Sequence, residues 1–326
     1  MKTLILTQHE IPALLPMAGM IDAMEGAFRA LSAGDARLPL RSVQPLSGDR
    51  GNFAVMPGQL GGDFGLKVIA VMPGNHGGPH DSHPGAVLLF DPETGRLIAL
   101  MDASAITALR TAAVSGLATR LLARPNAGTL ALLGAGTQAR THLEAMAEVR
   151  ALNAVRVWSR RRETVDAFIE WAAGRWPVAA AASPREAVEG ADLVCTVTAA
   201  ATPVLEGAWL APGTHINAVG ASLRTTREID VQAVSRASIF VDRAESALAE
   251  AGELLQAREE GAWDGTMTEL ADLVAGTARG RADDREITLF ESLGLAIEDL
   301  AAARALYERA KASGAGTWIE FGGYRT

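Results

Sequence analysis

The chain has 326 residues, of which 48% are hydrophobic and 21% are charged, a composition typical of a globular protein with a sizeable core. Its formal net charge of −8 argues against a nucleic-acid partner, because phosphate backbones need a basic face. The single cysteine, Cys195, excludes an intramolecular disulfide and fits a reducing compartment. Apolar runs end too early for a signal peptide or a membrane span. We therefore expect a cytoplasmic protein without a membrane partner.

The first third of the sequence predicts a helix followed by short antiparallel strands. Apolar residues recur at spacings of three and four from Ile21 to Leu31, which predicts a helix that ends at Gly34. Short β-type segments and turn residues then alternate from residue 41 to residue 102. We expect hairpins that pair 43–46 with 53–56 and 86–90 with 96–101, and a further strand over 65–72.

The rest of the chain predicts a parallel sheet with helices between its strands. A helix is expected from about Ser104 to Leu122, before Pro125. Strand and helix patterns then alternate, which is typical of βαβ units. The expected strands are 129–133, 154–158, 193–197, 214–219 and 238–241. A last helical pattern runs from Ile287 to Lys311.

A glycine-rich motif at the first of these strands predicts a dinucleotide site. The motif reads G-x-G-x-x-A and consists of Gly134, Ala135, Gly136, Thr137, Gln138 and Ala139. The first glycine allows a tight turn, and the second lets the backbone approach a pyrophosphate. The alanine lets the next helix pack on the strand, and the amino end of that helix favours an anion.

The end of the next strand predicts which dinucleotide binds. Enzymes that use NAD usually carry a carboxylate there for the ribose 2′-hydroxyl. This sequence has Ser159, Arg160 and Arg161 instead, with no carboxylate before Glu163. Guanidinium groups suit a 2′-phosphate, so we expect NADP(H), with NAD(H) as a weaker cofactor. The alternative interpretation is a solvated basic start of a helix.

Motifs along nearly the whole chain resemble the ornithine cyclodeaminase/μ-crystallin family. Besides the glycine-rich motif, the resemblance is carried by 39–41, 65–67, 82–85, 88–91, 101–102, 107–113, 216–220 and 290–294. It implies an α/β fold with two domains and a homodimer. Residues 1–122, with about 296–326, would form an α+β domain for substrate binding and dimerisation. Residues 123–295 would form a Rossmann-type domain that binds NADP.

The resemblance also implies site residues. In the family, residues matching Arg41, Lys67 and Arg110 line the substrate site beside the nicotinamide, and Arg110 also reaches the cofactor. Residues around the cofactor match Ser82, His83, Thr196, Thr198, Val219, Ala221 and Leu293.

The chemistry of these residue types supports such roles. An arginine offers a planar fork for the carboxylate of an α-imino acid. Lys67 lies inside an apolar strand, where a lysine needs a partner or a task, and desolvation would lower its pKa and suit acid–base work. We therefore expect Lys67 and Arg110 to be catalytic. The alternatives are ion pairs, for Lys67 with a carboxylate and for Arg110 at a helix surface. Glu228 is first interpreted as part of a helix start and also as a candidate for the substrate pocket.

One departure from the family pattern bears on the reaction. Ornithine cyclodeaminases carry an aspartate two residues after the glycine that matches Gly220, and this sequence has Ser222 there, followed by Leu223 and Arg224. A serine cannot replace that carboxylate. The sequence resembles the members that reduce Δ1-pyrroline-2-carboxylate or Δ1-piperideine-2-carboxylate to L-proline or L-pipecolate. The alternatives are a cyclodeaminase-type lyase, an amino-acid dehydrogenase, or a crystallin-type protein that binds NADPH without turnover.

A histidine-rich segment is also a candidate metal site. His76, His80, Asp81 and His83 lie in a stretch rich in glycine and proline. Their spacing differs from that of helix-borne zinc motifs, so we expect no metal and interpret the segment as a loop over the active site.

Overall fold

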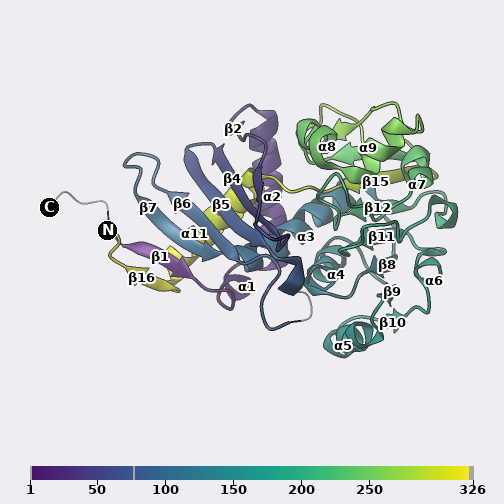
Figure 1. Cartoon of the computed structure of the whole chain (residues 1–326), viewed down its shortest axis with the longest axis horizontal. Coiled ribbons are helices and arrows are strands. Elements are labelled where there is room, and N and C mark those ends of the chain that lie inside the picture. The colour runs from purple at the N-terminus through teal and green to yellow at the C-terminus, as the bar shows by residue number, and fades with distance from the viewer. Residues whose placement is uncertain (1, 76–77, 323–326) are drawn as a thin grey trace. The chain divides into compact units, whose positions relative to one another are not determined.

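The computed structural model describes residues 2–75 and 78–322, which form two compact units (Figure 1). Unit 1 comprises Met1–Arg110 and Leu295–Thr326, and unit 2 comprises Thr111–Gly294. The first boundary falls inside helix α3 (Ala103–Leu122), whereas the sequence placed it at the end of that helix. Periodicity marks where a helix ends, and not where its packing partners change. Within the described residues, no helix is both long and apolar enough to cross a membrane.

Unit 1 contains a mostly antiparallel sheet, in the order β16-β1-β7-β6-β5-β4-β2, with β3 paired to β4. Its strands are β1 (Thr3–Leu6), β2 (Ala36–Arg37), β3 (Ser42–Pro45), β4 (Asn52–Leu60), β5 (Asp63–Val71), β6 (Gly85–Phe90), β7 (Leu97–Asp102) and β16 (Thr317–Ile319). Its other elements are α1 (Ile11–Leu14), α2 (Met17–Ser32), η1 (Pro73–Asn75) and α11 (Ala296–Ser313). Both expected hairpins form, as the β3–β4 and β6–β7 pairs, and the N-terminal helix is confirmed as α2.

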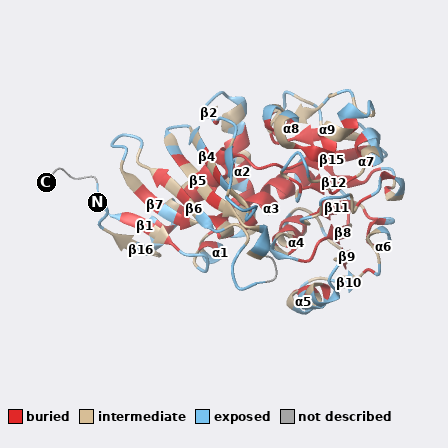
Figure 2. Ribbon diagram, in the orientation of Figure 1, coloured by how far each residue is buried: buried red, intermediate tan, exposed pale blue. Residues whose placement is uncertain are grey.

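Helix α11 packs against β4, β5 and β6 and determines which face of this sheet is buried. Side chains alternate between the two faces of a strand, and Figure 2 shows the alternation of buried and less buried residues along these strands. In β5, Gly65, Lys67 and Ile69 are buried, whereas Leu66 and Val68 are only half-buried. A Cβ atom on Gly65 would lie 2.7 Å from Leu300 Cδ2 on α11. Lys67 therefore points to the side of the sheet that α11 covers.

Unit 2 contains a wholly parallel sheet in the order β10-β9-β8-β11-β12-β15-β13-β14. Its strands are β8 (Thr129–Leu133), β9 (Ala154–Trp158), β10 (Val178–Ala180), β11 (Leu193–Thr196), β12 (His215–Ala218), β13 (Ala237–Val241), β14 (Thr268–Glu269) and β15 (Ile287–Glu291). Its helices are α4 (Thr137–Val149), α5 (Arg162–Ala172), α6 (Pro184–Val188), η2 (Gly207–Trp209), α7 (Val231–Arg236), α8 (Ala244–Glu250), α9 (Gly252–Glu259) and α10 (Leu270–Ala275). The first five strands follow Rossmann order, which confirms the expected α/β fold class.

The helix expected from Ile287 to Lys311 is wrong in its first part. Ile287–Glu291 is β15, fully buried between β12 and β13. Its side chains are buried on both faces, so the segment lacks the alternation that would have indicated a strand. Gly294 then adopts φ +82°, a conformation that favours glycine, and α11 begins only at Ala296.

Candidate active site

The segments of unit 2 that were expected to bind a dinucleotide follow five neighbouring strands. They lie at the carboxyl ends of β9, β8, β11, β12 and β15, which are adjacent in this order. Because carboxyl ends of parallel strands meet at one edge, the structure brings these residues together. They are Ser159 to Arg161, Gly134 to Gln138, Thr196 with Thr198, Val219 with Ala221, and Leu293. Strand order reverses between β8 and β11, which is where open α/β sheets bind their ligands.

The glycine-rich motif fits a pyrophosphate. Gly134 has φ +118°, and a Cβ atom there would lie 2.6 Å from the carbonyl oxygen of Val197, so the turn requires glycine. Gly136 is the N-cap of α4, and no side chain caps this helix end. A Cβ atom on Gly136 would meet no described atom within 4 Å. The amino end of α4 thus faces open space that a side chain at position 136 would enter and that a phosphate can occupy.

The arginines after β9 are placed for an anionic ligand. Arg160 and Arg161 are exposed, in the short connection between β9 and α5. Arg162 forms an ion pair with Asp166 at 2.8 Å, whereas within residues 2–75 and 78–322 neither Arg160 nor Arg161 has such a partner. Two guanidinium groups are therefore available beside the dinucleotide motif.

Four buried carboxyl groups lie near the same edge of the sheet. We call them the acidic cluster: Asp242, Glu228, Glu253 and Glu291. Each is at most 1% exposed. Burial raises the pKa of Glu228 and raises the pKa of Glu253 to about 8. Burial and the neighbouring Glu253, Asp242 and Glu228 carboxyl groups raise the pKa of Glu291 well above its ordinary value.

Two members of the acidic cluster each accept hydrogen bonds from several backbone N–H groups. Asp242 Oδ2 accepts hydrogen bonds from the backbone N–H groups of Leu293 at 2.8 Å and Gly294 at 2.6 Å. The Glu228 carboxylate accepts hydrogen bonds from the backbone N–H and hydroxyl of Thr198 and from the backbone N–H of Gly220. The structure therefore places the Glu228 carboxyl inside unit 2 with 0% exposure, although the sequence made it a candidate substrate ligand.

In unit 1, two basic and two acidic side chains form a buried ion-pair cluster: Lys67, Arg110, Glu298 and Asp299. Lys67 Nζ lies 2.8 Å from Asp299 Oδ2 and 3.0 Å from Asp299 Oδ1. Arg110 Nε lies 3.2 Å from Asp299 Oδ1, and its Nη1 lies 2.7 Å from Glu298 Oε2. Lys67 and Arg110 are 2% and 5% exposed, so Lys67 forms the ion pair that the sequence left as an alternative, whereas Arg110 is paired in the interior and not at a helix surface.

Electrostatics connect a third expected residue with this cluster. The pKa of Lys67 is lowered to about 8, chiefly by burial; Asp299 raises it, and the charges of Arg110 and Arg41 lower it further. The structure thus brings Arg41, Lys67 and Arg110 into one electrostatic environment. A lysine whose pKa lies near neutrality can hold a proton and release it within the physiological range.

Sequence reasoning missed Glu298 and Asp299. They are two adjacent carboxylates in a helix rich in alanine and leucine, and they lie between Ile297 and Leu300. That apolar setting could have indicated buried acids in need of a basic partner. Lys67 and Asp299 are 232 positions apart in the chain, so no local pattern joins them.

Two further expected residues lie in unit 1, at the connection between β5 and β6. Ser82 Oγ lies 2.8 Å from His83 Nδ1, and Ser104 Oγ donates to the carbonyl oxygen of His83 at 2.9 Å. His76 of the candidate metal motif lies outside the described residues. Among the residues that are described, no group of three or more histidine, cysteine, aspartate or glutamate side chains could hold a metal ion.

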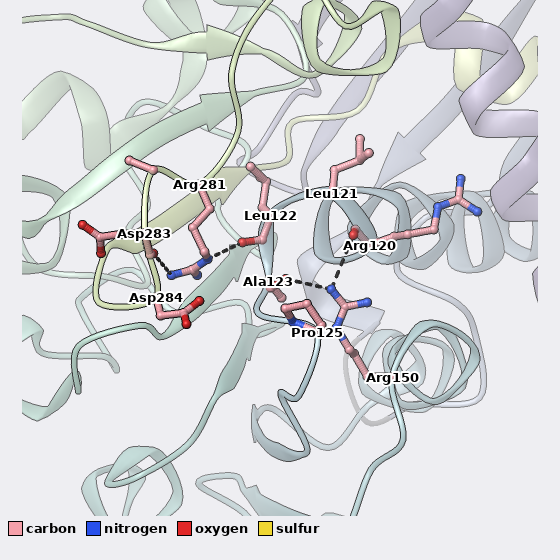
Figure 3. A pocket seen from close by; sticks show the side chains of 10 residues that line it. Arg120, Leu121, Leu122, Ala123, Pro125, Arg150, Arg281, Asp283 and Asp284 are labelled. Carbon is pink, nitrogen blue, oxygen red and sulfur yellow. Dashed lines mark hydrogen bonds between the residues drawn. The ribbon is translucent and has the colours of Figure 1, made fainter.

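A cavity of 520 Å³ in unit 2 lies at the other edge of the parallel sheet (Figure 3). Its lining residues precede β8, β9 or β15, or end α3. Arg150 Nη2 donates to the carbonyl oxygens of Thr119 and Ala123, and Arg281 Nε donates to that of Leu122. These guanidinium groups cap the carboxyl end of α3. The cavity is therefore part of the scaffold, at the amino ends of the strands and away from the dinucleotide motif.

Comparison with known proteins gives likenesses over almost the whole chain. Mouse ketimine reductase mu-crystallin is 39% identical over 294 residues, which cover 89% of this chain and 91% of the relative. The Δ1-pyrroline-2-carboxylate reductase of Thermococcus litoralis, solved with NADH and L-proline, has a TM-score of 0.94 at 38% identity. That likeness covers 97% of this chain and 99% of the solved chain.

Two further comparisons bear on the family. An archaeal alanine dehydrogenase dimer with bound NAD has a TM-score of 0.92 at 35% identity and covers 98% of this chain and 100% of its own. Residues 1–314 match the sequence model of the ornithine cyclodeaminase/mu-crystallin family. The chain therefore belongs to the ornithine cyclodeaminase/mu-crystallin family.

Proposed function

We propose that this protein is an NADPH-dependent reductase of cyclic ketimines, which converts Δ1-pyrroline-2-carboxylate or Δ1-piperideine-2-carboxylate to L-proline or L-pipecolate. The observation that carries the proposal is the likeness, over 97% of the chain, to a Δ1-pyrroline-2-carboxylate reductase solved with L-proline. The mouse ketimine reductase, at 39% identity, supports the same reaction class.

Charge in unit 1 supports an anionic substrate. The charges of Arg110 and Arg41 act on Lys67. The carboxylates of Glu298 and Asp299 form the ion pairs with Arg110 and Lys67. Basic side chains of this kind suit the carboxylate of an α-imino acid. We assign carboxylate binding to Arg41 and Arg110, because a planar guanidinium suits a carboxylate.

The reaction adds a hydride to the imine carbon and a proton to the imine nitrogen. When it is bound, the reduced nicotinamide supplies the hydride. Lys67 is the residue to which we assign the proton, because its pKa of about 8 leaves it mostly protonated at neutral pH. Asp299 holds the lysine ammonium in place through contacts of 2.8 and 3.0 Å.

Unit 2 would hold the cofactor through the glycine-rich motif and the arginines after β9. A matched pair of glycine variants tests the first part. Gly136→Ala should leave the melting temperature of the protein without cofactor unchanged and abolish the rise in melting temperature on adding NADPH, because the new Cβ enters the open cradle. Gly134→Ala should lower the melting temperature itself, because its Cβ meets Val197. Equal cofactor-induced shifts in wild type and Gly136→Ala would contradict this assignment.

The arginines are tested by the choice of cofactor. Replacing Arg160 and Arg161 together by alanine should weaken NADPH much more than NADH, since only NADPH carries the 2′-phosphate. Arg162→Ala is the matched control, because this arginine pairs with Asp166. Equal weakening of both cofactors would remove the preference for NADP(H).

The deciding experiment measures loss of the absorbance of NADPH with each cyclic ketimine, with NADH and L-ornithine as controls. Rapid oxidation of NADPH would establish the reductase, and the two rates would give the preferred ring size. Conversion of ornithine to proline and ammonia would mean a lyase despite Ser222. A second candidate, amino-acid dehydrogenation, is favoured by the alanine dehydrogenase likeness and predicts reduction of NAD(P)⁺ with L-alanine. Tightly bound NADPH without turnover would favour a binding role.

We further propose a cytoplasmic homodimer formed through the face of the unit 1 sheet that faces away from α11. Strand register places these partly exposed apolar side chains on that face: Phe53, Val55, Phe64, Leu66, Leu88 and Leu100. Phe64 and Phe90 stack there at 5.5 Å between ring centroids. An apolar patch of this kind marks an interaction surface, and the solved alanine dehydrogenase is a dimer. Leu66→Lys with Leu88→Lys should give a monomer in light scattering; an unchanged mass would exclude this face.

A further inference from the structure

Glu228 joins the ends of two neighbouring strands of unit 2. Its Oε1 accepts hydrogen bonds from the backbone N–H of Thr198 at 2.5 Å and from Thr198 Oγ1 at 2.6 Å, just after β11. Its Oε2 accepts from the backbone N–H of Gly220 at 2.6 Å, just after β12. One carboxylate therefore connects both loops that leave the carboxyl edge of the sheet at this point.

The space around this carboxylate is filled by protein. A Cβ atom on Gly220 would lie 2.0 Å from the carbonyl oxygen of Thr198 and 2.7 Å from Glu228 Cδ. Glu228 is 0% exposed. The contacts that the Glu228 carboxylate makes are therefore contacts within unit 2.

The backbone of Glu228 is fixed as firmly as its side chain. Its N–H donates to Glu253 Oε1 at 3.1 Å. Its carbonyl oxygen accepts from the N–H groups of Val204 at 2.7 Å and Leu205 at 3.0 Å. The carboxylate thus extends from an anchored point in the chain.

These contacts close a loop. Residues 220–228 leave β12 and return to Glu228, whose carboxylate binds the N–H of Gly220 at the start of the loop. Gly252 packs directly against the loop, because a Cβ atom on Gly252 would lie 2.3 Å from the carbonyl oxygen of Thr226. The tip of the loop carries the exposed Arg224 and the half-buried Ser222, the position at which this chain departs from the cyclodeaminases.

We propose that Glu228 is a positioning residue that clamps Thr198 and Gly220 together, so that the loop 220–228 presents Ser222 and Arg224 in one fixed conformation. For catalysis, the inference rests on the proposed function, since Thr198 and the loop belong to the expected cofactor and substrate surroundings. The clamp needs a carboxylate, because backbone N–H groups only donate. A glutamine would offer one oxygen and one NH₂ group, and could satisfy only one of the two loops.

The test combines amide hydrogen exchange with kinetics on Glu228→Gln. Exchange at the amides of Thr198 and Gly220 should accelerate about tenfold or more, the size expected for losing a buried charge-assisted hydrogen bond. With the best ketimine substrate, kcat should fall by about 10²-fold, because small misplacements are costly in catalysis. The Kd for NADPH should change less than kcat does, because Gly134 and the amino end of α4 are not bonded to Glu228.

Two matched variants separate the clamp from general damage. Glu253→Gln keeps an oxygen for the N–H of Glu228, so exchange at Thr198 and Gly220 should stay as in wild type. Thr198→Val removes only the hydroxyl donor and serves as the milder variant if Glu228→Gln does not fold. It should accelerate exchange at the same two amides to a smaller degree.

The exchange result does not depend on the identity of the substrate. Faster exchange at these two amides in a protein that reduces no ketimine would support the clamp and refute the proposed function. Unchanged exchange in Glu228→Gln and Thr198→Val would overturn the clamp. A kcat equal to that of wild type with faster exchange would overturn its role in positioning.

Discussion

The two units of this protein bury charge in opposite ways. In unit 1, Lys67 and Arg110 face Glu298 and Asp299, so each charge has a partner of opposite sign. In unit 2, the acidic cluster gathers four carboxyl groups of one sign. Two of them, Glu228 and Asp242, each accept hydrogen bonds from at least two backbone N–H groups. The other two, Glu253 and Glu291, have strongly raised pKa values.

The difference predicts how each arrangement responds when a carboxyl group is replaced. Opposite charges that neutralise each other in the interior stay ionised, and removing one leaves the other uncompensated at a large cost. Like charges avoid that cost by keeping protons. The same chemical change, from a carboxylic acid to its amide, should therefore have opposite consequences in the two units.

The largest effect is expected in unit 1. Asp299→Asn removes the carboxylate that contacts both Lys67 and Arg110, so it should lower the free energy of unfolding by about 3–5 kcal/mol at pH 7. Denaturant unfolding measures this loss. Asp166→Asn, which breaks the exposed pair with Arg162, should cost less than about 1 kcal/mol. Similar losses in the two variants would contradict the view that the cluster is ionised.

The next effect concerns activity. If the protonated form of Lys67 is required, kcat/KM for the ketimine should fall about tenfold per pH unit above the lysine pKa of about 8. Lys67→Arg keeps a positive charge at higher pH, so any remaining activity should lose this alkaline limb. An alkaline limb that is identical in both proteins would assign it to another group.

These two clusters also show how far sequence reasoning reaches. The glycine-rich motif, the parallel strands and the oddly placed Lys67 could be predicted, because each depends on residues close together in the chain. The partner of Lys67 could not, since Asp299 comes from α11, which packs on β5 only in the folded protein.

Unit 2 shows the same limit. Strand β15 was predicted as helix because burial on both faces removes the alternation that indicates a strand. With that strand misassigned, Glu291 could not be placed beside Ala218 of β12 and Val241 of β13. The acidic cluster therefore had no counterpart in the sequence pattern.

A smaller effect, with a pH dependence, is expected for Glu253→Gln. The pKa of Glu253 rises from 4.5 to about 8 on folding, so the folded state binds more protons than the unfolded state between these pH values. Wild-type stability should therefore fall as pH increases through this window, and the glutamine variant lacks this loss. Its melting temperature should exceed that of wild type at pH 9 by a few degrees, with the advantage shrinking toward pH 5. A constant difference from pH 5 to 9 would mean that Glu253 does not titrate in this window.

The smallest effect is expected for Glu291→Gln at neutral pH. Neither oxygen of Glu291 has a hydrogen-bond partner among the described residues, and its pKa lies well above the ordinary value because of burial and the neighbouring carboxyl groups. A raised pKa favours the uncharged acid, and the amide has nearly the same size and no charge either. The free energy of unfolding should change by less than about 0.5 kcal/mol, measured beside Asp299→Asn under the same conditions. A loss of several kcal/mol would mean that Glu291 is ionised and paired, so that the two units bury charge in the same way after all.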